Sequence, residues 1–177
     1  MHDNSNKEQV IVITGPSGAG KSTLARKLAV ELDCAAVIDI ENVNYMIANG
    51  FKEIKADNES GLSFNKWNLA GDTIGLLASN FLDNNYQVII HGHVTEELIS
   101  SIENRVDITQ KIMLLPNIAS VVLRDKTRGN HLSMGEDMVR KHYEYFLTSG
   151  WNEFIRVDST NEDVSTTLEK IKAILGR

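Results

Sequence analysis

The 177-residue sequence is poor in cysteine, proline and aromatic residues, and it contains no long apolar run. Its single cysteine, Cys34, cannot form an intrachain disulfide and has no CxxC companion, so we expect a small buried apolar residue at this position. No apolar run approaches the roughly 18 residues of a membrane span, and residues 1–9 lack the apolar core of a signal peptide. The sequence therefore predicts a cytoplasmic protein with a flexible tail at residues 1–9.

Positive charge is also scarce, because 18 Lys and Arg stand against 24 Asp and Glu and the formal net charge is −6 at pH 7. A broad basic surface, which would displace the counterions of a nucleic acid or bind an anionic membrane, is therefore disfavoured, although a local basic pocket is not. We expect no nucleic-acid partner and no membrane partner. The sequence is compatible with either a monomer or a homodimer.

Short apolar runs alternate with amphipathic segments from residue 10 onward. Strands are predicted at 10–14, 35–40, 86–92, 111–116 and 153–158, and helices at 21–32, around 67–81, and at 118–128, 136–147 and 164–175. This alternation predicts a three-layer α/β/α fold whose parallel sheet of five strands is covered by helices on both faces. One domain over residues 10–177 is expected, with two polar, glycine-flanked stretches at 50–65 and 128–135 that resemble mobile lids.

The segment GPSGAGKST at residues 15–23 matches the spacing G-x-x-x-x-G-K-[ST] and lies between a predicted strand and a predicted helix. In such a loop the backbone N–H groups surround phosphates, Lys21 supplies a mobile cation, and the Ser22 hydroxyl is a ligand for Mg²⁺. The sequence therefore predicts a site for ATP and Mg²⁺. The residues predicted to bind the nucleotide are Gly15, Pro16, Ser17, Gly18, Ala19, Gly20, Lys21, Ser22 and Thr23.

Two acidic residues follow the second predicted strand. Asp39 lies at its carboxyl end, the edge where open α/β sheets bind their ligands, and Glu41 faces the same way if the strand continues by two residues. Such acids could hold Mg²⁺ through water or accept the proton of an attacking hydroxyl. The alternative is that Asp39 or Glu41 is the N-cap of a helix.

Three segments together resemble the small P-loop kinases of the shikimate, gluconate, adenylylsulfate and chloramphenicol phosphotransferase type: GPSGAGKST, then IDIEN, then RDKTR at 124–128. The resemblance implies a sheet of strand order 2-3-1-4-5, an acceptor-binding region at 42–85 and a lid at 126–138. It also implies a base or water-mediated Mg²⁺ residue at Asp39 and substrate contacts at Glu41 and Asn42. Arg124 would stack on adenine, and Arg128 would be a lid arginine on the phosphates.

One feature departs from common P-loop patterns. The third predicted strand ends in VIIHGHV, so His91 stands where many P-loop proteins have an aspartate that binds Mg²⁺ through water. Because histidine is a poor partner for Mg²⁺, metal positioning falls on Ser22, the nucleotide and water, with Asp39 or Glu41 as further candidates. His91 and His93 could form a transition-metal pair, but two ligands without a third make a weak site. A polar lining of the acceptor pocket and a hydrogen-bonded strand end are the alternatives for His91.

The sequence thus predicts a phosphotransferase that moves the γ-phosphoryl group of ATP to a hydroxyl of a small molecule, with Lys21, Asp39 and Arg128 as catalytic residues. The candidate acceptor contacts are Asp39, Glu41, Asn42, His91 and Arg140. Trp67 is expected in the core rather than in the acceptor site. Two alternatives stay open: a nucleotide-binding regulator with slow ATP hydrolysis, and a nucleoside or nucleotide kinase with a basic acceptor pocket around Lys52, Lys55 and Arg140.

Overall fold

The structure is a computed structural model that describes residues 9–48, 66–127 and 133–177. The strands are β1 (Val10–Thr14), β2 (Ala35–Asp39), β3 (Gln87–His91), β4 (Gln110–Leu114) and β5 (Ile155–Val157). The helices are α1 (Lys21–Val30), α2 (Ile40–Tyr45), α3 (Lys66–Leu82), α4 (Glu96–Glu103), α5 (Ile118–Lys126), α6 (Glu136–Tyr145) and α7 (Val164–Ile174), with a short 3-10 helix η1 (Ser149–Trp151).

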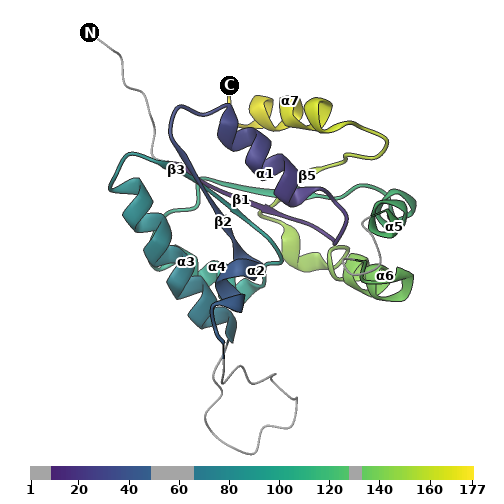
Figure 1. The fold of residues 1–177 in the computed structure, drawn as a ribbon, viewed down its shortest axis with the longest axis horizontal. Helices are drawn as coiled ribbons and strands as arrows, with labels where there is room; N and C mark the ends of the chain where they lie inside the picture. Colours follow the sequence, from purple (N-terminus) through teal and green to yellow (C-terminus); the bar gives the residue numbers. More distant parts are fainter. Residues whose placement is uncertain (1–8, 49–65, 128–132) are drawn as a thin grey trace, which may run out of the picture.

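The five strands form one parallel sheet of order β2-β3-β1-β4-β5, which confirms the predicted fold (Figure 1). Because the strands are parallel, their carboxyl ends meet at one edge of the sheet. The loop between β1 and α1 leaves from the central strand at this edge. The ends of β2 and β3 lie beside it, since Asp39 pairs in register with His91 and Ile13 pairs with the same residue from the other side.

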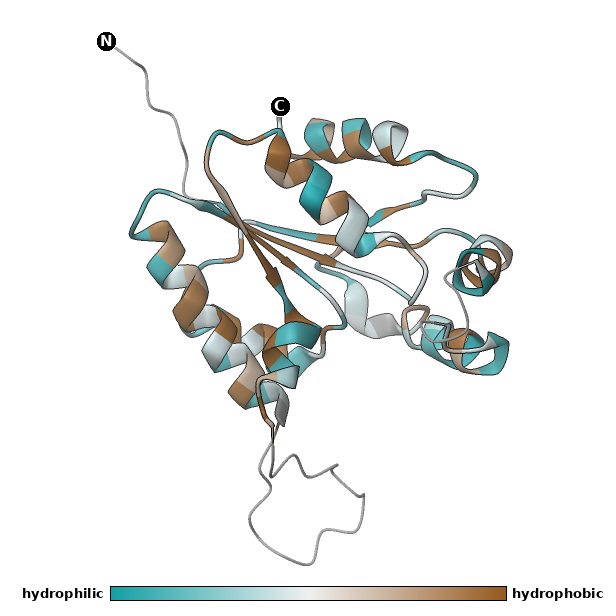
Figure 2. Ribbon diagram, viewed as in Figure 1, coloured by the Kyte–Doolittle hydropathy of each residue, from teal (hydrophilic) through white to brown (hydrophobic). Residues whose placement is uncertain are grey.

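Different helices cover the two faces of the sheet. All five residues of β1 are buried, as expected for a strand between two helical layers. Its side chains alternate, so Val10 and Val12 pack with residues of α3 and α4, whereas Ile11 and Ile13 pack with residues of α1 and α7. Figure 2 shows apolar residues along the strands and on the sides of these helices that face the sheet.

Several predicted boundaries need correction. β2 ends at Asp39 and does not continue to Glu41, because α2 begins at Ile40. Helix α4 was not expected either, although Thr95 caps it by accepting a hydrogen bond from the N–H of Leu98 at 3.2 Å. Cys34 was expected to be buried and is exposed, because it lies in the turn between α1 and β2.

Gln9, the last residue of the predicted tail, lies beside the sheet, because its carbonyl accepts a hydrogen bond from the N–H of Val88 at 2.8 Å. The rest of the expected tail, the stretch 50–65 with Lys52 and Lys55, and Arg128 lie outside the described residues. Within the part of the chain that the structure describes, no helix is long and apolar enough to cross a membrane.

Candidate functional site

The glycine loop is held tightly against the elements behind it. Gly15 and Gly18 have φ angles of 140° and 87°, which side-chain-bearing residues rarely adopt. A Cβ at Gly15 would lie 2.2 Å from the carbonyl oxygen of Leu114, and one at Gly18 would lie 2.9 Å from that of Val121. The loop therefore packs its backbone directly on β4 and α5, an approach that glycine alone allows.

The positive end of the loop is formed by α1 and Lys21. Among the described residues, no side chain caps the N-terminus of α1, whose N-cap is Gly20, so this helix end offers the positive potential that binds anions. The ammonium of Lys21 donates hydrogen bonds to the carbonyl oxygens of Gly15 at 2.9 Å and Pro16 at 3.1 Å. The cation thus lies over its own loop, at the place where phosphates are expected.

Asp39 connects the end of β2 to α2 and to β3. Its Oδ1 accepts hydrogen bonds from the N–H groups of Glu41 at 3.0 Å and Asn42 at 3.4 Å, so Asp39 is the N-cap of α2. Its Oδ2 lies 3.9 Å from Nε2 of His91, which is only 3% exposed. Burial lowers the pKa of His91, which the nearby Asp39 carboxylate raises to a lesser extent. The neutral imidazole is therefore favoured at this position.

Glu41 points toward the segment that follows β3. Its Oε1 accepts a hydrogen bond from the N–H of His93 at 3.1 Å. Gly92 leaves room for this contact, because a Cβ there would lie 2.5 Å from Oε2 of Glu41. Burial and a hydrogen bond with Asp39 raise the pKa of Glu41. Asp39 and Glu41 therefore lie close together, as expected. The first turn of α2 brings them together, not an extension of β2.

His142 contacts the glycine loop and His93 contacts His142, an arrangement that no sequence pattern predicted. Nδ1 of His142 in α6 accepts a hydrogen bond from the backbone N–H of Ser17 at 3.2 Å. Its Nε2 lies 2.9 Å from Nδ1 of His93. Burial lowers the pKa of His142 to about 4, with a smaller contribution from the charge of Lys21. A neutral His142 that accepts at Nδ1 carries its proton on Nε2. This N–H donates a hydrogen bond to Nδ1 of His93.

His93 belongs to an aromatic cluster. The centroid of its ring lies 5.6 Å from that of Trp67, 5.1 Å from that of Tyr145 and 5.9 Å from that of Phe146. Trp67 is half-buried and packs against the core, as expected. Trp67 also lines a cavity, whereas the sequence predicted a place in the core alone.

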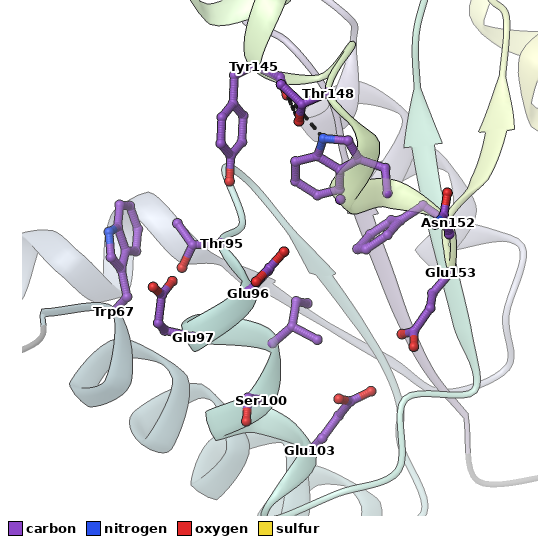
Figure 3. A pocket seen from close by; sticks show the side chains of 14 residues that line it. Trp67, Thr95, Glu96, Glu97, Ser100, Glu103, Tyr145, Thr148, Asn152 and Glu153 are labelled. Atoms are coloured by element: carbon purple, nitrogen blue, oxygen red, sulfur yellow. Dashed lines mark hydrogen bonds between the residues drawn. The ribbon is translucent and has the colours of Figure 1, made fainter.

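This cavity, the α4–α6 cavity, has a volume of about 730 Å³. It is lined by Trp67 of α3, by Thr95 and residues of α4, and by residues between Tyr145 and Phe154. In Figure 3 the side chains of Glu96 and Glu97 lie between Trp67 on one side and the segment that carries Asn152 and Glu153 on the other. A second cavity, with a volume of about 370 Å³, borders the glycine loop itself.

The second cavity, the α5–α7 cavity, is lined by Gly18, Ala19, Gly20 and Thr23 of the loop and α1, by Arg124, and by residues 159–167. One guanidinium nitrogen of Arg124 donates a hydrogen bond to the carbonyl oxygen of Ser159 at 2.9 Å. The Oγ of Ser159 is buried and has no hydrogen-bond partner among the described residues. A buried hydroxyl without a partner is costly, and a polar ligand in this cavity would satisfy it.

Other predicted site residues lie apart from both cavities. Arg140 forms an ion pair with Glu136 at 2.7 Å on the exposed side of α6. Asn42 is exposed, and His91 lines neither cavity. In the described ranges no group of three or more His, Cys, Asp or Glu could hold a metal ion. The ring of His93, which the sequence suggested as a metal-binding partner of His91, contacts His142.

The described part of the predicted lid is anchored by a buried carboxylate. Asp125 near the end of α5 is 1% exposed. It accepts hydrogen bonds from the hydroxyl of Ser133 at 2.7 Å and from the N–H groups of Met134 and Gly135, both at 3.3 Å. These bonds hold the segment that enters α6, and α6 in turn carries His142 to the glycine loop.

The fold and the glycine loop are those of a P-loop protein. Residues 3–141 match the family model described as ABC transporter. This match covers more than half of the chain, and the chain belongs to that family of P-loop proteins. Among curated proteins, none matches the sequence.

Several solved structures share the fold. A tunicamycin resistance protein from Deinococcus radiodurans has a TM-score of 0.71 at 16% identity and covers 96% of both chains. A sugar kinase from Janibacter sp. has a TM-score of 0.72 at 15% identity, covering 95% of this chain and 94% of that one. A gluconokinase from Sinorhizobium meliloti has a TM-score of 0.62 at 14% identity and covers 96% of both chains.

Proposed function

We propose that the protein is a phosphotransferase that moves the γ-phosphoryl group of ATP to a hydroxyl of a small molecule. The observation that carries this proposal is the phosphate loop with one cavity beside it and a second cavity that His93 and His142 connect to the loop. A transferase needs separate places for the nucleotide and the acceptor, with the phosphates between them. The fold that the chain shares with a sugar kinase and a gluconokinase supports the same class of reaction.

The α5–α7 cavity is the proposed nucleotide-base site. Arg124 lies in its wall, and a guanidinium plane stacks well on a purine ring. The buried hydroxyl of Ser159 would gain a partner from the polar edge of the base. From there the phosphates would extend along the backbone of residues 15–23 to Lys21, which would exchange its two carbonyl partners for phosphate oxygens.

The residues beside the loop suit Mg²⁺ in part. The hydroxyl of Ser22 and the carboxylate of Asp39 are hard oxygen donors, which Mg²⁺ prefers, whereas the buried imidazole of His91 is not. When bound, Mg²⁺ would neutralise charge on the phosphate oxygens. Asp39 is the proposed base or orienting group for the acceptor hydroxyl, because it lies at the edge of the sheet where the phosphates end.

A second candidate function is ATP hydrolysis without an acceptor, in a regulatory protein. The match to the ABC transporter model favours this candidate. The residue at the end of β3 weighs against it, because His91 stands where hydrolysing P-loop proteins hold Mg²⁺ through an aspartate.

Measurement of ADP release from ATP and Mg²⁺ tests the proposal, with and without a panel of hydroxyl compounds. We expect at least one class of compound to raise the rate above the acceptor-free rate. Lys21→Ala should remove this stimulated rate by about 100-fold or more, because the transferred group loses its cation. Lys27→Ala is the matched control, since Lys27 is an exposed residue of the same helix. Retention of the stimulated rate in Lys21→Ala would contradict the assignment.

A further inference from the structure

The α4–α6 cavity has an unusual combination of side chains. The charged residues among those that line it are all glutamates, and none of the described lining residues is a lysine or arginine. Four aromatic side chains contribute to the same walls. The acidic residues are Glu96, Glu97, Glu103 and Glu153, and the aromatic residues are Trp67, Tyr145, Trp151 and Phe154.

The negative charge is concentrated at one end of the cavity. Glu103 and Glu153, at the other end, both form ion pairs with the ammonium of Lys111, which lies 2.7 Å from Glu103. Neither Glu96 nor Glu97 forms an ion pair with any described residue. Burial raises the pKa of Tyr145, and Glu97 and Glu96 raise it further. Their negative potential therefore reaches the aromatic wall of the cavity.

Aromatic faces beside carboxylates favour a particular kind of ligand. A cation gains attraction from the face of a tryptophan or tyrosine as well as from the acids, and a ring compound stacks on the same faces. Trp67 and Tyr145 are both half-buried, so part of each ring is accessible. An anion, by contrast, would meet uncompensated negative charge at Glu96 and Glu97.

The charged end of the cavity is also the end near the phosphate loop. Trp67 and Tyr145 both contact the ring of His93, and His93 contacts His142, which accepts the hydrogen bond from Ser17. Two imidazole rings therefore separate this end of the cavity from the glycine loop. A ligand held between the aromatic wall and the acids would direct its nearer end toward the phosphates.

We propose that the α4–α6 cavity is the acceptor site and that the acceptor is a cationic ring compound, an alcohol with at least one protonated amine, as in an amino sugar or an aminocyclitol. This inference rests on the proposed phosphotransferase function. In the reaction the acceptor oxygen forms a bond to the γ-phosphorus, the bond from that phosphorus to the β–γ bridging oxygen breaks, and ADP leaves. For this transfer the reacting hydroxyl must extend from the cavity past His93 to the carboxyl edge of the sheet, where its proton passes to the carboxylate of Asp39. A nucleotide or sugar-acid acceptor would require a basic lining, which the described lining residues do not provide.

Calorimetry with glucosamine, 2-deoxystreptamine and neamine, each compared with its N-acetylated neutral form and with glucuronate, tests the inference. We expect at least one amine to bind about tenfold or more tightly than its neutral form. The double variant Glu96→Gln and Glu97→Gln should lose most of this preference. Glu144→Gln should keep it, because Glu144 is exposed on α6 and does not line the cavity.

Failure of all three amines to bind, or an unchanged preference in the double variant, would overturn the inference. ADP release measured with the same compounds separates it from the proposed function. An amine that binds through Glu96 and Glu97 without raising ADP release would support the cavity assignment and contradict phosphotransfer to that ligand. Stimulation by glucuronate or by the neutral forms alone would support phosphotransfer and overturn the cationic class.

Discussion

His142 occupies a backbone donor of the phosphate loop. It holds the N–H of Ser17 through Nδ1, and backbone N–H groups of such a loop are the donors that phosphates require. His142 therefore competes with the nucleotide for this donor.

Replacing His142 with Ala should tighten ADP binding by about two- to tenfold, since a net hydrogen bond contributes about 0.5–1.5 kcal/mol. Titration calorimetry measures this change directly. Lys141→Ala, at the exposed neighbouring position, should leave the affinity unchanged. Weaker binding in His142→Ala would mean that the imidazole contacts the nucleotide rather than competing with it.

The lowered pKa of His142 also predicts how stability depends on pH. Its pKa falls from 6.5 to about 4 in the folded protein, so the unfolded chain binds more protons between these values. The contribution of His142 to stability is therefore present above pH 6.5 and is lost as the pH falls toward 4. Glu41 has the opposite dependence, because its raised pKa favours the protonated form in the folded state.

Thermal unfolding of the wild type and of His142→Asn between pH 4 and pH 7 isolates this effect, because asparagine keeps an acceptor for Ser17 but does not titrate. The melting temperature of the variant should fall less steeply with decreasing pH. Parallel curves would show that His142 does not titrate in this range.

Among the elements, α2 begins at a residue with two roles that substitutions can separate, Asp39. Asp39 is the N-cap of this helix, and it is also the proposed base. Asparagine caps a helix about as well as aspartate, whereas alanine costs about 1 kcal/mol.

Asp39→Asn should therefore retain stability and nucleotide affinity while acceptor-dependent kcat falls by about 100-fold or more. Asp39→Ala should lose both activity and about 1 kcal/mol of unfolding free energy. Urea unfolding and ADP release measure the two effects on the same samples. Full turnover in Asp39→Asn would leave Asp39 as a structural cap alone.

The connection between α5 and α6 depends on Asp125. Its buried carboxylate binds three groups of the segment that leads into α6, so Asp125→Ala should lower the free energy of unfolding by about 1–3 kcal/mol. Because α6 carries His142, nucleotide affinity should change as well. Glu144→Ala, on the exposed side of α6, is the control for urea unfolding, and an equal effect in the two variants would contradict the anchoring role.

Local patterns predicted most elements, and the failures also have local causes. β1, α1 and α3 have unambiguous apolar periods and were predicted almost to their boundaries. The segment IENVNY of α2 is short and follows a strand without a break, so its helical hydrogen bonds depend on the cap at Asp39. Helix α4 had usable signals, namely Thr95 as a cap and two acids in its first turn.

At the scale of the whole molecule, each of the two cavities is lined by segments that lie far apart in the sequence. The phosphate loop was predictable because its glycines, Lys21 and Ser22 follow one another at a fixed spacing within a single short segment. The pair His93 and His142 was not, because 49 residues separate them and α6 must pack beside β3 before they meet. The acidic charge of the α4–α6 cavity likewise depends on bringing α4 beside the segment after α6.

The proposed reaction moves a phosphoryl group from ATP at the phosphate loop to an acceptor hydroxyl. The most direct test follows the γ-phosphorus of radiolabelled ATP, with Mg²⁺ and the compounds used for binding, and separates labelled acceptor from labelled inorganic phosphate. The account predicts labelled acceptor with the wild type and none with Lys21→Ala. Label found in inorganic phosphate alone, at a rate that no acceptor changes, would contradict phosphotransfer and favour the ATPase.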